Sequence, residues 1–80
     1  MSVNVYMPDL STLDFTMETG VIAEWLKKEG DQVEKGEPLF EVETAKVVTE
    51  IKSQASGRIL KILKPKGAEV PVGEKIAIIG

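Results

Sequence analysis

Two stretches of the sequence repeat one another at a distance of 37 residues, and this duplication constrains the fold most. Residues 20–37, G-V-I-A-E-W-L-K-K-E-G-D-Q-V-E-K-G-E, align with residues 57–74, G-R-I-L-K-I-L-K-P-K-G-A-E-V-P-V-G-E. The identical positions are Gly20/Gly57, Ile22/Ile59, Leu26/Leu63, Lys27/Lys64, Gly30/Gly67, Val33/Val70, Gly36/Gly73 and Glu37/Glu74. Paired glycines indicate turns with positive φ or close backbone approach, so we expect two copies of one structural unit.

Short runs with strand character lie between these glycines. A helix over E-W-L-K-K-E is excluded because Gly20 and Gly30 enclose only nine residues and the second copy ends in a proline. The predicted strands are Val3–Met7, Val21–Leu26, Leu39–Glu43, Val47–Ile51, Arg58–Leu63 and Lys75–Ile79, with very short strands around Val33 and Val70. The sequence therefore predicts an all-β fold, a flattened barrel or sandwich of two four-stranded antiparallel sheets with internal two-fold pseudosymmetry.

The duplication also predicts which residues form the core. Trp25 aligns with Ile62, which favours a core or half-buried position over ligand stacking, and the pairs Ile22/Ile59, Leu26/Leu63 and Val33/Val70 are further core candidates. The first strands of the halves, Val3–Met7 and Val47–Ile51, are 44 residues apart, so seven extra residues are expected within Pro8–Thr19. The enlarged loop indicates either an added function or a tolerated insertion.

The halves, at about residues 1–43 and 47–80 of a single domain, meet at Thr44-Ala45-Lys46. We expect this junction to be a hairpin with Lys46 at its tip. A two-fold axis relating the halves would map the hairpin onto the chain ends, so the termini should lie together, far from Lys46. By position alone, such a lysine is most simply a solvated side chain.

Composition narrows the possible functions. The chain has neither cysteine nor histidine, so no thiolate metal site, disulfide or histidine base is available, and no nucleophile-base pair can be assembled. Catalysis and a metal site are therefore not expected. Residues 1–50 hold 11 acids and 4 bases, which makes nucleic acid a poor partner, and no apolar run is long enough for a membrane span. The start M-S-V-N-V-Y-M-P lacks the features of a targeting signal, so a bacterial or archaeal cytoplasm is expected, or the mitochondrial matrix for a trimmed eukaryotic chain.

The segment E-T-A-K-V, Glu43–Val47, is similar to the E-T-D-K-A hairpin of lipoyl domains, which belong to the dihydrolipoamide acyltransferase of 2-oxo acid dehydrogenase complexes. The likeness continues through M-P-D-L from Met7, T-G-V-I-A-E-W-L-K-K-E-G-D from Thr19, V-E-K-G-E-P-L-F-E-V-E from Val33 and S-G-R-I-L-K-I-L from Ser56, and so covers essentially the whole chain. The resemblance implies a non-catalytic carrier in which Lys46 bears lipoate in amide linkage and shuttles acyl groups and reducing equivalents.

The resemblance also implies the partners and the recognition residues. The partners are a lipoate ligase or lipoyl transferase, a thiamine-diphosphate-dependent 2-oxo acid decarboxylase, the acyltransferase core and dihydrolipoyl dehydrogenase, with the isolated domain monomeric. Recognition around the lysine falls to Glu43, Thr44, Ala45 and Val47, and recognition by the decarboxylase to the enlarged loop with Leu10, Ser11, Thr12, Asp14 and Phe15. Two plainer interpretations stay open: Glu43 as a strand-end carboxylate on the polar face, and Phe15 folded onto the core.

Ala45 departs from the family, which usually has aspartate there, and its alanine is expected to soften the turn or alter recognition. Biotinyl carriers share the fold but flank their lysine with methionines, as in A-M-K-M, whereas Lys46 has Ala45 and Val47. A biotinyl carrier is therefore one alternative. An unmodified structural β module, like the similar hairpins of membrane-fusion adaptor proteins, is another.

Overall fold

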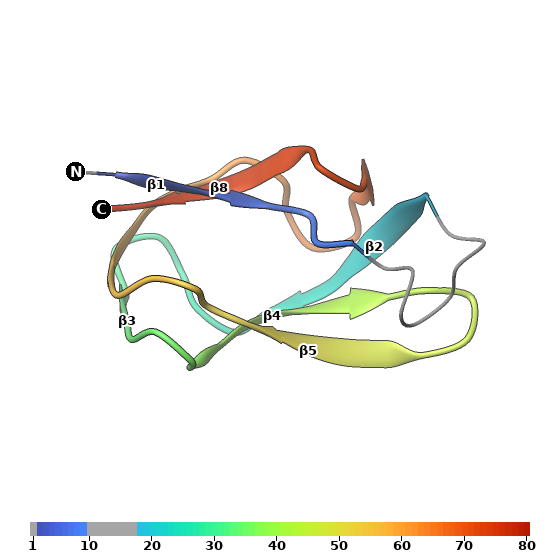
Figure 1. Cartoon of the computed structure of the whole chain (residues 1–80), viewed down its shortest axis with the longest axis horizontal. Helices are drawn as coiled ribbons and strands as arrows, with labels where there is room; N and C mark the ends of the chain where they lie inside the picture. The colour runs from blue at the N-terminus through green and yellow to red at the C-terminus, as the bar shows by residue number, and fades with distance from the viewer. Residues whose placement is uncertain (1, 10–17) are drawn as a thin grey trace.

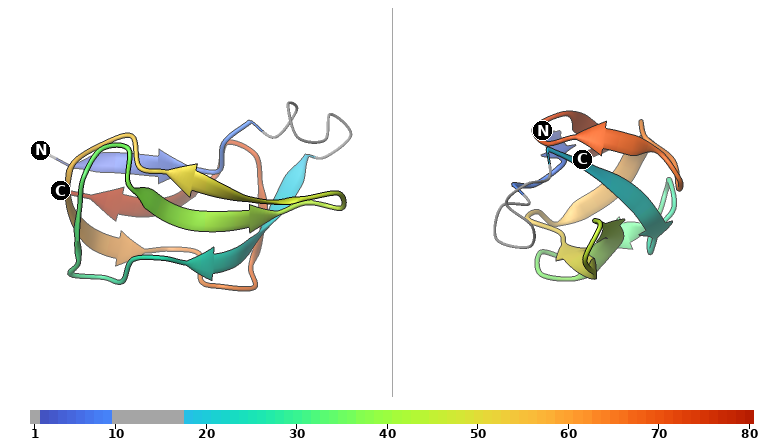
Figure 2. Two further views of the ribbon diagram at one scale, coloured as in Figure 1. Left: turned by 90° about the horizontal axis from the view of Figure 1, so that it is seen from below. Right: turned by 90° about the vertical axis from the view of Figure 1, so that its right-hand side faces the viewer.

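The computed structural model describes residues 2–9 and 18–80, and every regular element within them is a strand. The strands are β1 (Val3–Tyr6), β2 (Thr19–Trp25), β3 (Gln32–Val33), β4 (Pro38–Glu43), β5 (Val48–Lys52), β6 (Gly57–Ile62), β7 (Glu69–Pro71) and β8 (Lys75–Ile79). They form two four-stranded antiparallel sheets, ordered β1-β8-β6-β3 and β5-β4-β2-β7. Figure 1 and Figure 2 show the sheets facing one another along an elongated molecule of 34 × 20 × 19 Å. The all-β prediction is confirmed.

The two sheets are copies of one another. Adding four to each strand number, and continuing from β8 back to β1, converts the order β1-β8-β6-β3 into β5-β4-β2-β7. The pairing repeats as well, since Gly20 of β2 lies opposite Val70, and Gly57 of β6 lies opposite Val33. Each sheet thus takes two strands from each half, and the predicted pseudosymmetry is present.

The offset between the first strands of the halves differs from the prediction. Val3 pairs with Ile79 and Thr49 pairs with Val42, and these two partners stand 37 residues apart. The offset between β1 and β5 is therefore 46 residues, from Val3 to Thr49, rather than 44. The first half consequently holds nine more residues than the second half between its first two strands, the difference between 46 and 37.

The core lies between the sheets and follows the duplication. The fully buried hydrophobic residues are Met7, Ile22, Val33, Leu39, Phe40, Val42, Ile59, Val70, Ile76, Ala77 and Ile79. Trp25 is half-buried: its ring lies 5.2 Å from that of Phe40, centroid to centroid, and its Nε1–H donates to the Lys64 carbonyl at 2.8 Å. The core predictions for Ile22/Ile59, Val33/Val70 and Trp25 are confirmed.

The prediction for Leu26 and Leu63 is wrong, because these side chains are 39% and 36% exposed. Each leucine follows directly after the last residue of a strand, Trp25 or Ile62. Both strands also contain a register shift, which interrupts the simple alternation of inward and outward side chains. The duplication shows that the two leucines occupy equivalent positions, but it does not show which way these positions face.

The repeated glycines serve two different purposes. Gly36 and Gly73 have φ near 90° in equivalent turns, a conformation that side chains with a Cβ rarely adopt. Gly57 instead lies within a strand, where a Cβ would come within 2.8 Å of the Gly80 carbonyl oxygen. The expectation of turns therefore holds for Gly36 and Gly73, whereas Gly57 permits close approach of the backbone.

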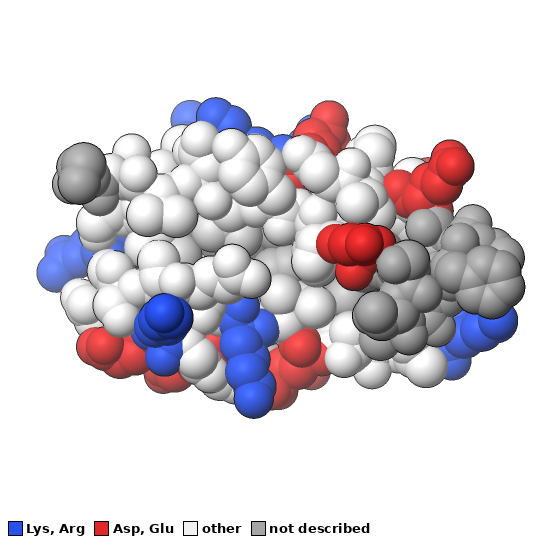
Figure 3. All heavy atoms as spheres, viewed as in Figure 1, with Lys and Arg blue, Asp and Glu red and all other residues white. Residues whose placement is uncertain are grey.

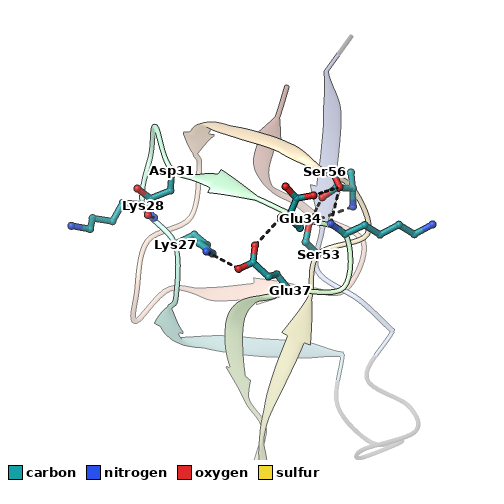
Figure 4. A network of polar contacts seen from close by, with 9 residues as sticks. Lys27, Lys28, Asp31, Glu34, Glu37, Ser53 and Ser56 are labelled. Carbon is teal, nitrogen blue, oxygen red and sulfur yellow. Dashed lines mark hydrogen bonds and ion pairs between the residues drawn. The ribbon is translucent and has the colours of Figure 1, made fainter.

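A polar network closes the turn before β4 (Figure 4). The Lys27 ammonium lies 3.1 Å from Glu37 Oε2, while the Glu34 amide donates to Glu37 Oε1 at 2.8 Å. The hydrogen bond from the Glu34 amide is the larger cause and the contact with Lys27 the next, and together they lower the pKa of Glu37 below its ordinary value. The second half repeats the ion pair between Lys64 and Glu74 at 3.5 Å, but there the residue equivalent to Glu34 is proline, which has no amide hydrogen to donate.

The edge strands β1 and β5 border a groove of about 230 Å³ along the seam between the sheets. Val5 and Ile51, which are equivalent under the offset of 46, both line it. Figure 3, in the view of Figure 1, shows an uncharged central area on this face, with Lys, Arg, Asp and Glu side chains toward its margins. Among the described residues, the groove's lining contains none of the predicted site residues.

Candidate functional site

Lys46 lies in the tight connection between β4 and β5. Glu43, the last residue of β4, pairs with Val48, the first residue of β5, so the chain reverses within the four residues 44–47. Ala45 and Lys46 are exposed at this turn, which forms one end of the molecule's long axis in Figure 2. The strands beneath hold the turn by pairing on both sides of β4, with β2 and with β5.

The chain ends lie at the opposite end of the molecule from this hairpin (Figure 1). Val3 of β1 pairs with Ile79 of β8, which brings the beginning and the end of the described chain together. This agrees with the sequence-based expectation that the hairpin and the termini are related by the pseudo-two-fold axis. A connection made at either terminus therefore leaves the Lys46 pole open.

Thr44 organises the turn from below. It is only 7% exposed, and its main-chain N–H donates to the Val47 carbonyl at 2.8 Å. Its hydroxyl oxygen Oγ1 accepts from the Lys46 amide at 3.3 Å and the Val47 amide at 3.2 Å, and the hydroxyl donates to the Val47 carbonyl at 3.3 Å. No non-glycine residue in the described part of the chain has positive φ, so the turn forms without the left-handed conformation usual in two-residue hairpins.

The other predicted site residues divide into two groups. Glu43, Ala45 and Val47 are exposed beside Lys46, with Glu43 positioned on the sheet between Val21 and Val48. The predicted recognition residues of the enlarged loop, Leu10, Ser11, Thr12, Asp14 and Phe15, lie outside the described residues.

Three glutamates beneath the hairpin were not singled out by the sequence. Glu41 of β4 lies directly opposite Glu50 of β5 on one side and Glu24 of β2 on the other, and we call these three residues the glutamate row. Lys66 forms an ion pair with Glu24 at 3.1 Å. Like charges directly opposite one another destabilise a sheet, so the row opposes folding. In the sequence, the alternation in E-V-E over residues 41–43 indicates only that Glu41 faces outward. Which residues lie opposite Glu41 depends on how the strands pair.

The chemistry available at this pole is that of an exposed primary amine. Among residues 2–9 and 18–80, no three histidine, cysteine, aspartate or glutamate side chains gather so as to hold a metal ion. The same residues include no helix long and apolar enough to cross a membrane. A lysine amine on a firmly held turn can form an amide with a carboxylic acid, and the long side chain then serves as the start of an arm.

Comparison with known proteins decides the family. Residues 3–79 match the model of the biotin/lipoyl family described as "Biotin-requiring enzyme". The chain belongs to this family. The exposed side chain of Lys46 offers a primary amine for the covalent attachment of a group. The chain's fold and its relatives are those of a lipoyl-type carrier.

Two curated relatives of the biotin/lipoyl domain are acetyltransferase components of pyruvate dehydrogenase complexes. The dihydrolipoyllysine-residue acetyltransferase component from Zymomonas mobilis is 46% identical over 99% of this chain and 18% of the relative. The mitochondrial component 2 from Arabidopsis thaliana is 53% identical over 90% of this chain and 13% of the relative. The chain thus spans less than a fifth of these relatives.

Two solved structures share the fold. The lipoyl domain of the 2-oxoglutarate dehydrogenase complex from Azotobacter vinelandii superposes with a TM-score of 0.74 at 30% identity, covering 98% of this chain and 95% of that one. The Kluyveromyces lactis urea carboxylase matches all of this chain and 6% of its own, with a TM-score of 0.79 and 25% identity. The fold therefore occurs both as a lipoyl domain and as a small part of a carboxylase.

Proposed function

We propose that Lys46 bears lipoate in amide linkage and that the chain is the swinging-arm carrier of a 2-oxo acid dehydrogenase complex. The observation that carries this proposal is the position of Lys46 on an exposed turn at the pole opposite both chain ends. A carrier needs this arrangement, because the tether and the working group must not obstruct one another.

The relatives support lipoate as the cofactor. Dihydrolipoyllysine is part of the name of both curated relatives, and one structural neighbour is itself a lipoyl domain. Ala45 and Val47 flank the lysine, in place of the methionines of the biotinyl pattern. The description of the family as "Biotin-requiring enzyme" favours biotin as the second candidate.

The bound lipoate would supply the dithiolane that accepts acyl groups and reducing equivalents. The residues of this chain supply position: the β4–β5 hairpin extends the amine beyond the sheets, and the remote termini allow a flexible link to the rest of a complex. Such a link makes each encounter intramolecular, at effective concentrations on the order of millimolar. The proposed partners are a lipoate ligase or lipoyl transferase, the 2-oxo acid decarboxylase, the acyltransferase core and dihydrolipoyl dehydrogenase.

Intact-mass measurement after incubation with a lipoate ligase, and separately with a biotin ligase, tests the proposal. The wild-type chain should gain one lipoyl group and no biotin, whereas Lys46→Arg should gain neither while keeping its circular dichroism spectrum. Lys52→Arg is the matched control, because Lys52 is an exposed lysine on β5 of the same hairpin, and this variant should be modified like the wild type. Modification of Lys46→Arg, or preferential biotinylation of the wild type, would overturn the proposal.

A further inference from the structure

We infer that Thr44 is a positioning residue for modification of Lys46, and that it acts through its buried hydroxyl rather than by touching the modifying enzyme. This rests on the proposed function, because it concerns the same lysine. The observation behind it is that Thr44 is 7% exposed, whereas its neighbours on the turn, Ala45, Lys46 and Val47, are all exposed. An enzyme approaching the hairpin meets those three residues, while the threonine lies beneath them.

The hydroxyl of Thr44 is fully used by the turn. A hydroxyl offers one donor and two acceptor positions, and here it donates to the Val47 carbonyl and accepts from the amides of Lys46 and Val47. The oxygen thereby bonds to the main chain of the modified residue itself. Fixing the Lys46 amide and both main-chain groups of Val47 restricts the rotations that decide where the lysine Cα–Cβ bond points.

This arrangement also accounts for Ala45. Aspartate would be expected to stabilise such a turn by bonding to the nearby backbone, and alanine has no group for that purpose. The Thr44 hydroxyl makes the corresponding bonds from one residue earlier, so the turn does not depend on the side chain at position 45. The expected softening of the turn by Ala45 is thereby offset.

The reach of a lysine explains why its direction matters. Before modification the amine stands at the end of a four-carbon stem, so the enzyme must bind the hairpin itself to bring the amine to its active site. If the turn has several conformations, only the competent fraction reacts, and kcat/KM falls to that fraction of its value for a fully ordered turn. The fold should persist, because Thr44 lies beyond the last residue of β4.

The test compares Thr44→Val, which removes the hydroxyl at nearly constant shape, with Thr44→Ser, which keeps it. With lipoate ligase, Thr44→Val should show kcat/KM lower by about tenfold, with thermal stability near that of the wild type, and Thr44→Ser should recover most of the loss. Thr49→Val is the matched control, because Thr49 is a half-buried threonine of the same hairpin that makes no bond to the turn, and it should retain wild-type kcat/KM.

Amide hydrogen exchange gives a readout that does not depend on modification. In the wild type, the amides of Lys46 and Val47 should exchange more slowly than that of Ala45, and in Thr44→Val both should exchange about tenfold faster. Wild-type kcat/KM in Thr44→Val, a Thr44→Ser variant as slow as Thr44→Val, or unprotected amides in the wild type would each overturn the inference. A wild-type chain with protected amides that no lipoate ligase modifies would instead overturn the proposed function alone.

Discussion

The sheet with the Lys46 hairpin and the sheet with the chain ends have the same strand order, yet their outer faces carry different charges. On the hairpin sheet, outward positions are occupied by the glutamates Glu24, Glu41, Glu43, Glu50 and Glu69. The positions equivalent to them on the other sheet are occupied by Lys61, Ile78, Gly80, Asn4 and Gln32, respectively. The duplicated residues therefore build the frame, whereas the outward glutamates at these positions belong to the hairpin sheet alone.

The two poles differ in the same way. The pseudo-two-fold axis relates the Thr44–Val47 turn to the chain ends, where no covalent connection between β8 and β1 is needed. One junction is closed by a turn that presents an amine, and the other is open. Two kinds of variant test these differences. One moves the lysine within its turn, and the other replaces a residue that differs between equivalent positions; the effect is measured on modification or on stability.

The largest effect is expected from moving the lysine within the turn. Lys46→Ala combined with Ala45→Lys should abolish modification by lipoate ligase, because residues 45 and 46 occupy different positions of the turn and their side chains leave it in different directions. The Thr44 hydroxyl also holds the amide of position 46 and makes no bond to the amide of position 45. Intact mass checks this. Ala45→Lys alone, with Lys46 retained, is the control and should gain a single lipoyl group. Modification of the relocated lysine at the native rate would show that register is irrelevant.

The next largest effect is expected in the core, where Phe40 is the counterpart of Ala77. Phe40→Ala makes the first copy like the second, but it leaves a cavity beside Trp25, which packs on the Phe40 ring. The expected cost is about 3–5 kcal/mol, a large share of the roughly 5–15 kcal/mol that stabilises a typical domain.

Chemical denaturation measures the cost of Phe40→Ala. Leu60→Ala is the control, because Leu60 is 52% exposed and its loss should change the free energy of unfolding by less than about 0.5 kcal/mol. Equal effects of the two substitutions would mean that the Phe40 site relaxes around the missing ring.

Much of this frame could be predicted from the sequence, because glycines and buried residues recur at a fixed distance. The offset between β1 and β5 could not be predicted. Offsets of 44 and 46 differ by two residues, so both keep the same side chains facing the core, and the alternation of a strand cannot distinguish them. No repeated glycine marks these two strands, so only the pairing of Val3 with Ile79 resolves the register.

The hairpin that carries Lys46 was predicted from the repeat junction, whereas the contacts that hold its turn were not. The inferred role of Thr44 required knowing that its side chain lies under the turn. A signal was present, since a turn without glycine, asparagine or aspartate needs another group to bond its amides, and threonine is able to do so. The glutamate row depended on which strands pair, which a local pattern does not contain.

A smaller effect is expected from the glutamate row. Glu41→Gln removes the central charge between Glu24 and Glu50, and the free energy of unfolding should rise by about 0.2–1 kcal/mol, more at low salt than at high salt. Denaturation at two ionic strengths measures this. Glu69→Gln is the matched control, because the cross-strand neighbour of Glu69 is Val21, and little change is expected. Equal stabilisation by both variants would point to net charge rather than the row.

The smallest effect should separate the two equivalent turns by pH. The folded state lowers the pKa of Glu37, so its carboxylate stabilises the fold above the unfolded-state pKa, and this contribution is lost as the pH falls through the lower folded-state pKa. Glu37→Gln should therefore lower Tm slightly at neutral pH. The difference from wild type should shrink as the pH falls below the unfolded-state pKa and vanish once the pH lies below the lower folded-state pKa.

Glu74→Gln is the control for this difference. Its ion pair with Lys64 is the counterpart of Lys27–Glu37, but Pro71 donates no amide hydrogen where Glu34 does. The bond from the Glu34 amide is the largest cause of the lowered pKa of Glu37, so Glu74→Gln should change Tm less than Glu37→Gln at neutral pH. Equal changes would assign the effect to the lysine pairs that the two copies share, rather than to the amide that only the first copy has.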